Sequence, residues 1–156
     1  MSFTFRPYSP DDRAACVALF TANTPHWFAA HEQEQYESFL DEAPAQYFVM
    51  PEENGAIAGV GGIEPETARG VGWLTWGMVD STRHGQGLGK TLLEYRLELL
   101  RANLRVNRVC IDSSQHTAPF YEKYGFTTQR VIPDGYALGL HRHEMGLAKL
   151  SDSAPG

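Results

Sequence analysis

Apolar residues recur at helical spacing in the first third of the chain, after a short alternating stretch at positions 3–7 that predicts a strand. Two segments repeat apolar residues at i, i+3 and i+4, which predicts one helix running to about Ala22 and a second that stops before Pro44. The second helix should bury one face and leave its acidic residues largely outside it: the apolar set is Tyr36, Phe39 and Leu40, and the acidic set is Glu32, Glu34 and Glu37.

The middle of the chain has the short apolar runs of β-strands. Three runs predict strands, separated by a tight turn at Glu53-Asn54-Gly55 and by a loop over 64–70; the runs are 47–50, 56–63 and 72–79. A glycine-rich turn at 85–89 then leads into a strongly periodic helix, whose leucines form an apolar stripe that reaches Leu104.

The last third predicts a strand, a short helix and a hairpin. The strand covers 108–112, and the helix covers 117–124 and is ended by Gly125. Two final strands, 126–132 and 136–147, are joined by a turn at Pro133-Asp134-Gly135. The 156-residue length is typical of one domain, which we place at 1–150, with 151–156 as a disordered polar tail.

Composition narrows the classes of protein to consider. With 42% hydrophobic residues the chain can bury a core without disulfide or metal staples. A net charge of −6 argues against a nucleic-acid-binding protein, which usually needs a basic patch. The two cysteines, Cys16 and Cys110, each lie in an apolar stretch and are expected to be reduced. No signal peptide and no apolar run near the ~20 residues of a membrane helix is found, so we expect a soluble cytoplasmic protein.

The glycine-rich turn has the arrangement of an anion site, because a strand, glycines and a helix start place unpaired N–H groups at a helix N-terminus. Two nucleotide motifs fit it imperfectly. The dinucleotide fingerprint G-x-G-x-x-G fails, since the glycines are Gly85, Gly87 and Gly89. The Walker pattern matches Lys90 and the threonine after it, but His84 occupies the place of its first glycine. Too few residues follow for a P-loop sheet, which argues against this class. It is kept as an alternative, as is a turn that binds nothing.

Two segments resemble the signatures of the GNAT acetyltransferase superfamily. Residues 79–93 read VDSTRHGQGLGKTLL and resemble its acyl-CoA-binding motif, Arg/Gln-x-x-Gly-x-Gly/Ala. Residues 114–126 read SQHTAPFYEKYGF and resemble its second signature, with an aliphatic-Tyr pair and a closing Gly-Phe. The motifs occur in the family's order, separated by a helix and a strand, and the resemblance covers roughly residues 3–147.

The resemblance implies an α/β fold with a mixed, mostly antiparallel central sheet flanked by helices. It implies a bulge in the fourth strand and a V-shaped splay between the fourth and fifth strands. It also implies acetyl-CoA as the acyl donor, with pantetheine against the fourth strand and the pyrophosphate on backbone amides of the glycine-rich turn. The implied cofactor-binding residues are Met78, Val79, His84, Gly85, Gln86, Gly87, Leu88, Gly89, Lys90, Ser114 and Tyr121.

Two positions depart from the family's pattern. His84 stands where the family has Arg or Gln, with Arg83 just before it, and Ser114 stands where the family has Asn. Backbone binding of the pyrophosphate does not depend on either side chain. Their own contacts to the cofactor are therefore left open.

Tyr121 aligns with the family's general acid. Attack of an amine on a thioester expels a thiolate, and a phenol of pKa ~10 is roughly matched to that thiol. The general base is less determined, because the predicted strand 72–79 has no ionisable residue. Glu64 is the first candidate; a water chain and three other side chains stay open, namely His26, Asp80 and His116.

The resemblance places the acceptor beside the loop between the first two helices, which carries His26, Trp27 and Phe28. The acidic residues of the following helix could attract a cationic amine or could simply form an exposed face. His141 and His143 share a strand face but have no third ligand nearby in sequence, so no metal is expected.

The sequence therefore predicts an N-acetyltransferase that moves an acetyl group from acetyl-CoA to a primary amine of a small molecule or peptide in a ternary complex. The alternatives are a P-loop-type nucleotide-binding enzyme and a non-catalytic acyl-CoA-binding module. Dimers are common in the family, so a homodimer is also an open expectation.

Overall fold

The structure is a computed structural model and describes residues 3–24, 26–83 and 85–147. The chain forms two compact units. The first unit is Met1–Ile63 with Thr75–Arg96, and the second is Glu64–Leu74 with Leu97–Gly156. Three elements contribute residues to both units: β3 (Ile57–Glu66), β4 (Val71–Val79) and α3 (Leu88–Arg101).

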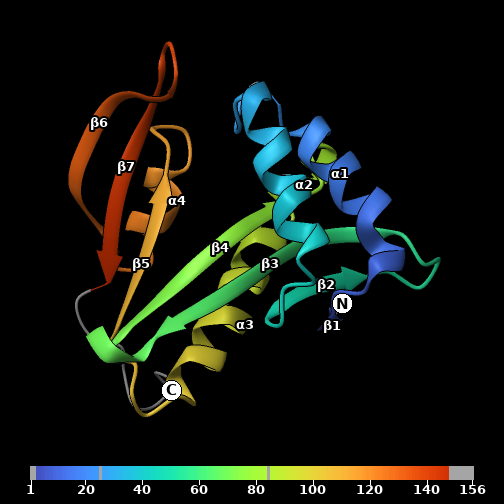
Figure 1. The fold of residues 1–156 in the computed structure, drawn as a ribbon, viewed down its shortest axis with the longest axis horizontal. Helices are drawn as coiled ribbons and strands as arrows, with labels where there is room; N and C mark the ends of the chain where they lie inside the picture. Colours follow the sequence, from blue (N-terminus) through green and yellow to red (C-terminus); the bar gives the residue numbers. More distant parts are fainter. Residues whose placement is uncertain (1–2, 25, 84, 148–156) are drawn as a thin grey trace. The chain divides into compact units, whose positions relative to one another are not determined.

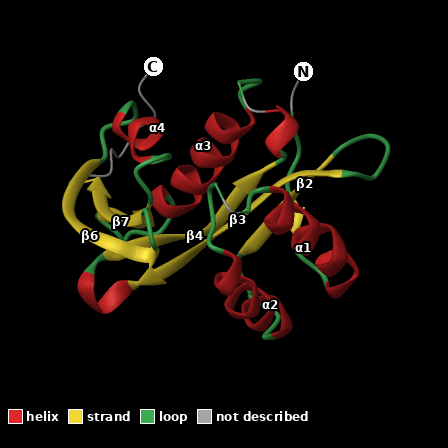
Figure 2. Ribbon diagram, turned by 90° about the horizontal axis from the view of Figure 1, so that it is seen from above, coloured by secondary structure: helices red, strands yellow, loops and turns green. Residues whose placement is uncertain are grey.

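The first unit is a small sheet with helices on both faces. Strand β1 (Arg6–Pro7) pairs antiparallel with β2 (Tyr47–Pro51), which pairs antiparallel with β3. Helices α1 (Arg13–Ala22) and α2 (Gln33–Asp41) lie on one side of β2 and β3, and α3 lies on the other (Figure 2). Both predicted N-terminal helices are confirmed, and so is the β2–β3 turn, where the Glu52 N–H donates to the Ala56 carbonyl (2.8 Å).

Aromatic rings dominate the core between the helix pair α1/α2 and the sheet. Phe20, Tyr36 and Tyr47 are fully buried there with Cys16. Burial raises the pKa of the Cys16 thiol to about 11, so this sulfur is protonated at neutral pH. The expected buried, unpaired cysteines are thus found at both positions, since Cys110 is also buried and free.

Glu32 corrects the prediction that the acidic residues of the second helix lie outside its apolar side. Its side chain is buried, and its carboxylate accepts a hydrogen bond from the Ala29 N–H (2.9 Å). Burial raises the pKa of Glu32, with that backbone donor opposing the rise. Glu32 thus caps the turn before α2, and this buried hydrogen bond accounts for a carboxylate in the interior.

The second unit is built on the C-terminal strands. β4 pairs in parallel with β5 (Arg108–Ser113) over three residues of each strand, Val71–Trp73 with Arg108–Cys110. β5 pairs antiparallel with β7 (Leu140–Leu147), and β7 pairs with β6 (Thr127–Ala137) in a long hairpin, orange to red in Figure 1. The short helix α4 (Ala118–Glu122) is confirmed, and Gly125 (φ +93°) follows it.

Three predicted boundaries are wrong in this region. β3 continues to Glu66, so Glu64 lies on a strand and the loop is shorter than expected. The final hairpin turns at Leu138 and Gly139, whereas Pro133-Asp134-Gly135 forms an irregularity inside β6. Leu104 is 97% exposed, because the helix ends at Arg101 before the stripe reaches it.

The strands follow the order β1-β2-β3-β4-β5-β7-β6 within the described part of the chain. The sheet is mixed and mostly antiparallel, with β4 and β5 as its parallel pair, which confirms the predicted fold class. Short parallel pairing at the beginnings of β4 and β5 is compatible with the predicted splay, which stays a prediction. No helix among residues 3–24, 26–83 and 85–147 is long and apolar enough to cross a membrane.

Candidate functional site in the first unit

The end of β4 leads directly into the glycine-rich turn. Met78 is buried in the aromatic core, and the Val79 carbonyl accepts a hydrogen bond from the Asn23 side-chain amide (3.1 Å). The next residue, Asp80, donates its N–H to the Ala58 carbonyl (2.8 Å). The strand end is thus fixed by a helix on one side and by β3 on the other.

A short turn over Ser81–Arg83 then presents the loop. Asp80 Oδ1 accepts hydrogen bonds from the N–H (3.0 Å) and the hydroxyl (2.7 Å) of Thr82. Arg83 forms an ion pair with Glu52 of the β2–β3 hairpin, and its Nε donates to Gln86 Oε1 (3.3 Å). The Arg83 side chain is therefore held between the loop and the β2–β3 hairpin.

Gly85 and Gly87 give the turn its shape. Their φ angles are +88° and +82°, a region that residues with a Cβ rarely adopt, and open space surrounds both α-carbons. The backbone is thus accessible to a ligand at both positions. His84, between Arg83 and Gly85, lies outside the described residues.

Helix α3 begins at once after this turn. The Thr91 N–H donates to the Gly87 carbonyl (3.0 Å), so the amides of Leu88, Gly89 and Lys90 belong to the first helical turn, whose N–H groups lack intrahelical acceptors. Together with the helix dipole they favour an anion. The Lys90 ammonium is exposed and lies 3.9 Å from the Glu94 carboxylate, a weak surface pair.

β4 has an unusual backbone conformation at Trp76, a position that the sequence analysis did not single out. Trp76 has φ +38°, a left-handed conformation in the middle of a strand. Its ring packs among the core aromatics, with centroids 5.0 Å from Tyr36 and 6.1 Å from Phe28. No local sequence signal marks this residue, since a bulky aromatic is among the least expected at positive φ.

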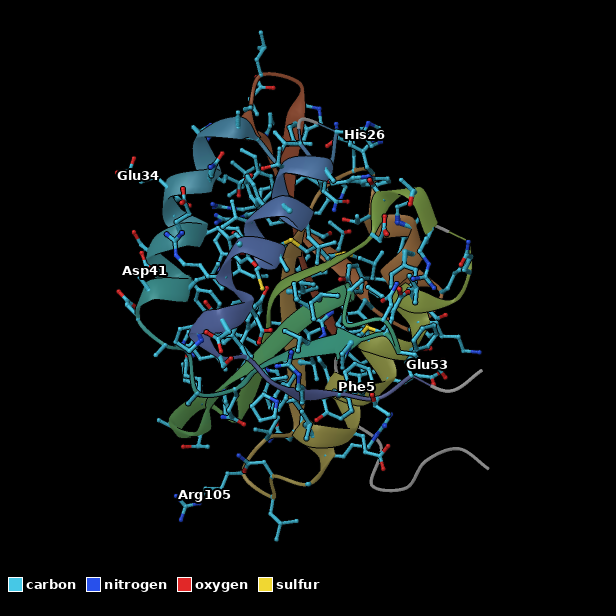
Figure 3. All side chains as sticks on the ribbon, turned by 90° about the vertical axis from the view of Figure 1, so that its right-hand side faces the viewer. Phe5, His26, Glu34, Asp41, Glu53 and Arg105 are labelled. Atoms are coloured by element: carbon cyan, nitrogen blue, oxygen red, sulfur yellow. The ribbon has the colours of Figure 1, made fainter. Side chains whose placement is uncertain are left out.

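Phe28 is the part of the predicted acceptor loop that joins this cluster. It is half-buried and stacks on Phe20 at 5.1 Å. His26 is exposed and its ring stands edge-on to Trp27 at 4.4 Å. Figure 3 shows His26 in the loop between the helices and Glu34 pointing outward from α2. Phe28 thus lies in the same unit as the glycine-rich turn and the end of β4.

The other predicted site residues belong to the second unit. Tyr121 of α4 is 9% exposed, and its ring makes edge contacts with Phe120 (5.1 Å) and Phe126 (5.5 Å). The buried Ser114 hydroxyl accepts the His116 N–H (3.2 Å), so it caps the turn before α4. The Ser114 side chain, which is shorter than the Asn of the family's pattern, thus makes a local bond to the backbone.

Candidate bases and metal ligands are also placed. Glu64 is exposed on β3 in the second unit, and Asp80 lies in the first unit beside Thr82. His141 Nδ1 accepts the Asp134 N–H (3.0 Å), and His143 Nδ1 lies 3.3 Å from the Thr128 hydroxyl. No group of three or more His, Cys, Asp or Glu residues suited to a metal ion occurs over the described ranges.

Similar proteins were found at three levels. A profile of the GNAT acetyltransferase domain matches residues 13–149. The glucosamine 6-phosphate N-acetyltransferase of Trypanosoma brucei brucei is 40% identical over 67 residues, which are 41% of this chain and 45% of that protein. The match to this curated relative therefore spans about half of its length.

Solved structures show the same fold at low identity. The ribosomal-protein-S18-alanine N-acetyltransferase from Escherichia coli has a TM-score of 0.75 and 17% identity, over 99% of this chain and 98% of that one. An aminoglycoside 6'-N-acetyltransferase complexed with coenzyme A has a TM-score of 0.73 and 14% identity, over 98% and 99%. Because the profile covers most of the sequence, this chain belongs to the GNAT acetyltransferase domain family.

Proposed function

We propose that this protein transfers an acetyl group from acetyl-CoA to a primary amine of a small molecule or a peptide. The observation that carries the proposal is the glycine-rich turn at the start of α3. Its two positive-φ glycines and the first-turn amides of the helix, which have no intrahelical acceptors, support a backbone anion site for a diphosphate. Membership of the acetyltransferase domain family gives that diphosphate its identity as part of coenzyme A.

The proposed donor site is made mainly of backbone. The amides from Gly85 to Lys90, together with the His84 position, would hold the pyrophosphate. The end of β4 at Met78 and Val79 would lie against pantetheine, with its peptide groups polarising the thioester carbonyl. Acetyl-CoA supplies the activated acetyl group, and the chain supplies position and a fixed field.

Proton transfer is assigned to side chains. Tyr121 would donate a proton to the departing thiolate, a role that suits a phenol. Glu64 is the proposed base for the amine, with Asp80, His26, His116 or a water chain as its competitors. Ser114 would contact the cofactor only if its hydroxyl can donate while it accepts the His116 N–H.

The acceptor is proposed to be bound beside His26, Trp27 and Phe28. The relative's acceptor, glucosamine 6-phosphate, belongs in any panel of amines because that protein is 40% identical over the matched segment. With a net charge of −6, the chain is not expected to bind nucleic acid.

Two measurements test the proposal in sequence. Calorimetry with CoA and with ATP distinguishes a coenzyme A site from a nucleotide site, and we expect heat of binding with CoA. Thiol release from acetyl-CoA across an amine panel then distinguishes an enzyme from a binding module. CoA binding without thiol release for any amine would leave only the non-catalytic module, and ATP binding without CoA binding would overturn the proposal.

A variant of Tyr121 tests the acid. Tyr121→Phe removes the hydroxyl and keeps the ring that packs on Phe126, so kcat should fall by about 10²-fold or more, in the range of general acid–base catalysis. Phe is also the residue least disturbing to the fold. Full turnover of this variant at every pH would remove Tyr121 from the mechanism.

A further inference from the structure

The positive φ of Trp76 is an unfavourable backbone conformation in the middle of β4. Non-glycine residues at positive φ survive only where the surrounding structure holds them, and such residues cluster at functional sites. Trp76 precedes Met78 by two residues, in the strand to which the proposed function assigns the thioester. We therefore asked which side chains hold it.

On the side of the sheet that packs against α1 and α2, a buried hydroxyl binds the Trp76 carbonyl. The Tyr47 hydroxyl donates a 2.7 Å hydrogen bond to the Trp76 carbonyl, and the Tyr36 hydroxyl lies 2.8 Å from it as its other partner. Both tyrosines are 0% exposed, and burial raises the pKa of each, so both stay protonated. The Trp76 carbonyl thus has a permanent donor.

On the α3 side, a buried cation backs the next residue. The Arg96 side chain is 2% exposed, and its Nε and Nη1 atoms have no hydrogen-bond partner among the described residues. A Cβ on Gly77 would lie 2.8 and 2.9 Å from the two terminal nitrogens of Arg96, and a Cβ on Gly61 would lie 3.3 Å from its Cζ. Two strand glycines therefore make the space that the guanidinium occupies.

The geometry of the peptide group connects these two contacts. In a planar trans peptide the carbonyl and the following N–H point in opposite directions. Fixing the Trp76 carbonyl on Tyr47 therefore also fixes the direction of the Gly77 N–H, and the Arg96 guanidinium lies against the Gly77 α-carbon. An unpaired positive charge in this low-dielectric interior favours negative charge nearby.

We propose, as a deepening of the proposed acetyltransferase function, that Tyr47 and Arg96 are positioning residues that hold the Trp76–Gly77 peptide of β4 in the orientation that acetyl transfer requires. Tyr47 acts through its hydrogen bond to the Trp76 carbonyl. Arg96 acts through its positive charge beside Gly77, which favours the negative, carbonyl end of the Trp76–Gly77 peptide. Neither residue is assigned a contact with acetyl-CoA or with the amine.

Tyr47→Phe tests the hydroxyl. Loss of one oxyanion donor costs about 10²–10³-fold in kcat, so a misdirected donor should cost about tenfold or more, while the dissociation constant for CoA changes by less than about twofold. Tyr8→Phe is the matched control, because the Tyr8 ring contacts Tyr47 edge-on at 6.0 Å. Among the described residues, the side-chain donor to the Trp76 carbonyl is Tyr47 and not Tyr8. This control should keep kcat.

Arg96 is tested by Arg96→Met and Arg96→Lys. A residue that only fills space would lose thermal stability in Arg96→Met, whereas removal of an unpaired buried charge should leave the midpoint of thermal unfolding unchanged or raised. We expect kcat to fall by about tenfold or more in Arg96→Met and to recover by at least about half of that loss, on a logarithmic scale, in Arg96→Lys. Arg101→Met is the control, since its Nε is also buried without a partner on the same helix.

The outcomes separate the two levels of inference. No thiol release by the unmodified protein rejects the proposed function itself. Thiol release by the unmodified protein with kcat unchanged in Tyr47→Phe or in Arg96→Met rejects the positioning role. If Tyr47→Phe does not fold, as judged by circular dichroism, the two Arg96 variants decide: equal kcat in Arg96→Lys and Arg96→Met also rejects it.

Discussion

At the scale of single residues, Asp12 shows how one buried carboxylate organises the start of a helix. Its two oxygens accept hydrogen bonds from the Arg6 guanidinium, both at 2.8 Å, and one oxygen also accepts the Ser9 N–H (3.0 Å). The hydrogen bonds from Arg6, the largest cause, hold the pKa of Asp12 below its ordinary value. The carboxylate thus ties the first strand to the turn that begins α1.

Asp12→Asn should destabilise the protein in a pH-dependent way. A depressed folded-state pKa gives stability that is present above the unfolded pKa of about 3.9 and is lost as pH falls through the folded pKa. At pH 7 we expect the variant to lose about 1–2 kcal/mol of unfolding free energy, a value reduced for the solvent exposure of Arg6. Urea denaturation at pH 7 and pH 3 measures the difference, and a gap of equal size at both pH values would contradict the assignment.

At the scale of elements, α3 carries both a buried leucine stripe and, at its first turn, the proposed ligand site. Its leucine stripe was readable from the spacing of Leu92, Leu93, Leu97 and Leu100, and all four are buried. Arg96 lies in the same stripe, so its burial was also implied by position. What the sequence could not show is the pair of strand glycines that accommodate it, because their contact depends on how β3 and β4 pack on the helix.

Two leucines test where the stripe ends. Leu100→Ala should cost about 2–5 kcal/mol of unfolding free energy, because Leu100 is 0% exposed and its loss leaves a cavity. Leu104→Ala should change it by less than about 0.5 kcal/mol, because that side chain is 97% exposed. Chemical denaturation of both variants measures this contrast. Equal losses of unfolding free energy would contradict the exposed position of Leu104.

The glycine-rich turn has a matched control elsewhere in the chain. Gly87 and Gly139 have nearly the same φ, +82° and +79°, and a Cβ would meet no atom within 4 Å at either position. Each Gly→Ala variant should pay the same backbone strain, about 1–2 kcal/mol. Only Gly87→Ala should also weaken CoA binding, by about tenfold or more, because the shifted backbone would misdirect an amide bond to the charged diphosphate. Such a bond is worth about 1.5–3 kcal/mol. Calorimetry distinguishes the pair; a similar loss in Gly139→Ala would make the effect one of general stability.

Predictions at turns succeeded or failed for physical reasons. The turn at Gly55 was predicted, since asparagine and glycine favour its backbone angles. Pro133-Asp134-Gly135 also consists of turn-favouring residues but lies inside β6, where Asp134 adopts φ +53° and its side chain accepts the Gly139 N–H (2.7 Å). Two turn-like segments close together therefore could not be ranked from local composition. The positive φ of Trp76 had no local sequence signal, and its carbonyl accepts a hydrogen bond from Tyr47, 29 residues away in the chain.

At the scale of the whole molecule, ligand binding should appear as stability. A ligand that binds only the folded state at 100 times its dissociation constant adds about 2.7 kcal/mol to the unfolding free energy. We therefore expect CoA to raise the melting temperature and ATP at the same concentration to leave it nearly unchanged. Because the chain has a net charge of −6, an unspecific preference for polyanions is not expected. A larger shift with ATP than with CoA would favour the nucleotide-binding alternative.

The burial of both cysteines has a practical consequence. Thiolates, not thiols, react with electrophiles, and burial raises the pKa of Cys16 to about 11 and also raises that of Cys110. Neither sulfur should therefore compete for a maleimide dye at neutral pH. A single Leu104→Cys substitution, at a 97% exposed position, then provides one site for a fluorescent label while both native cysteines stay in place.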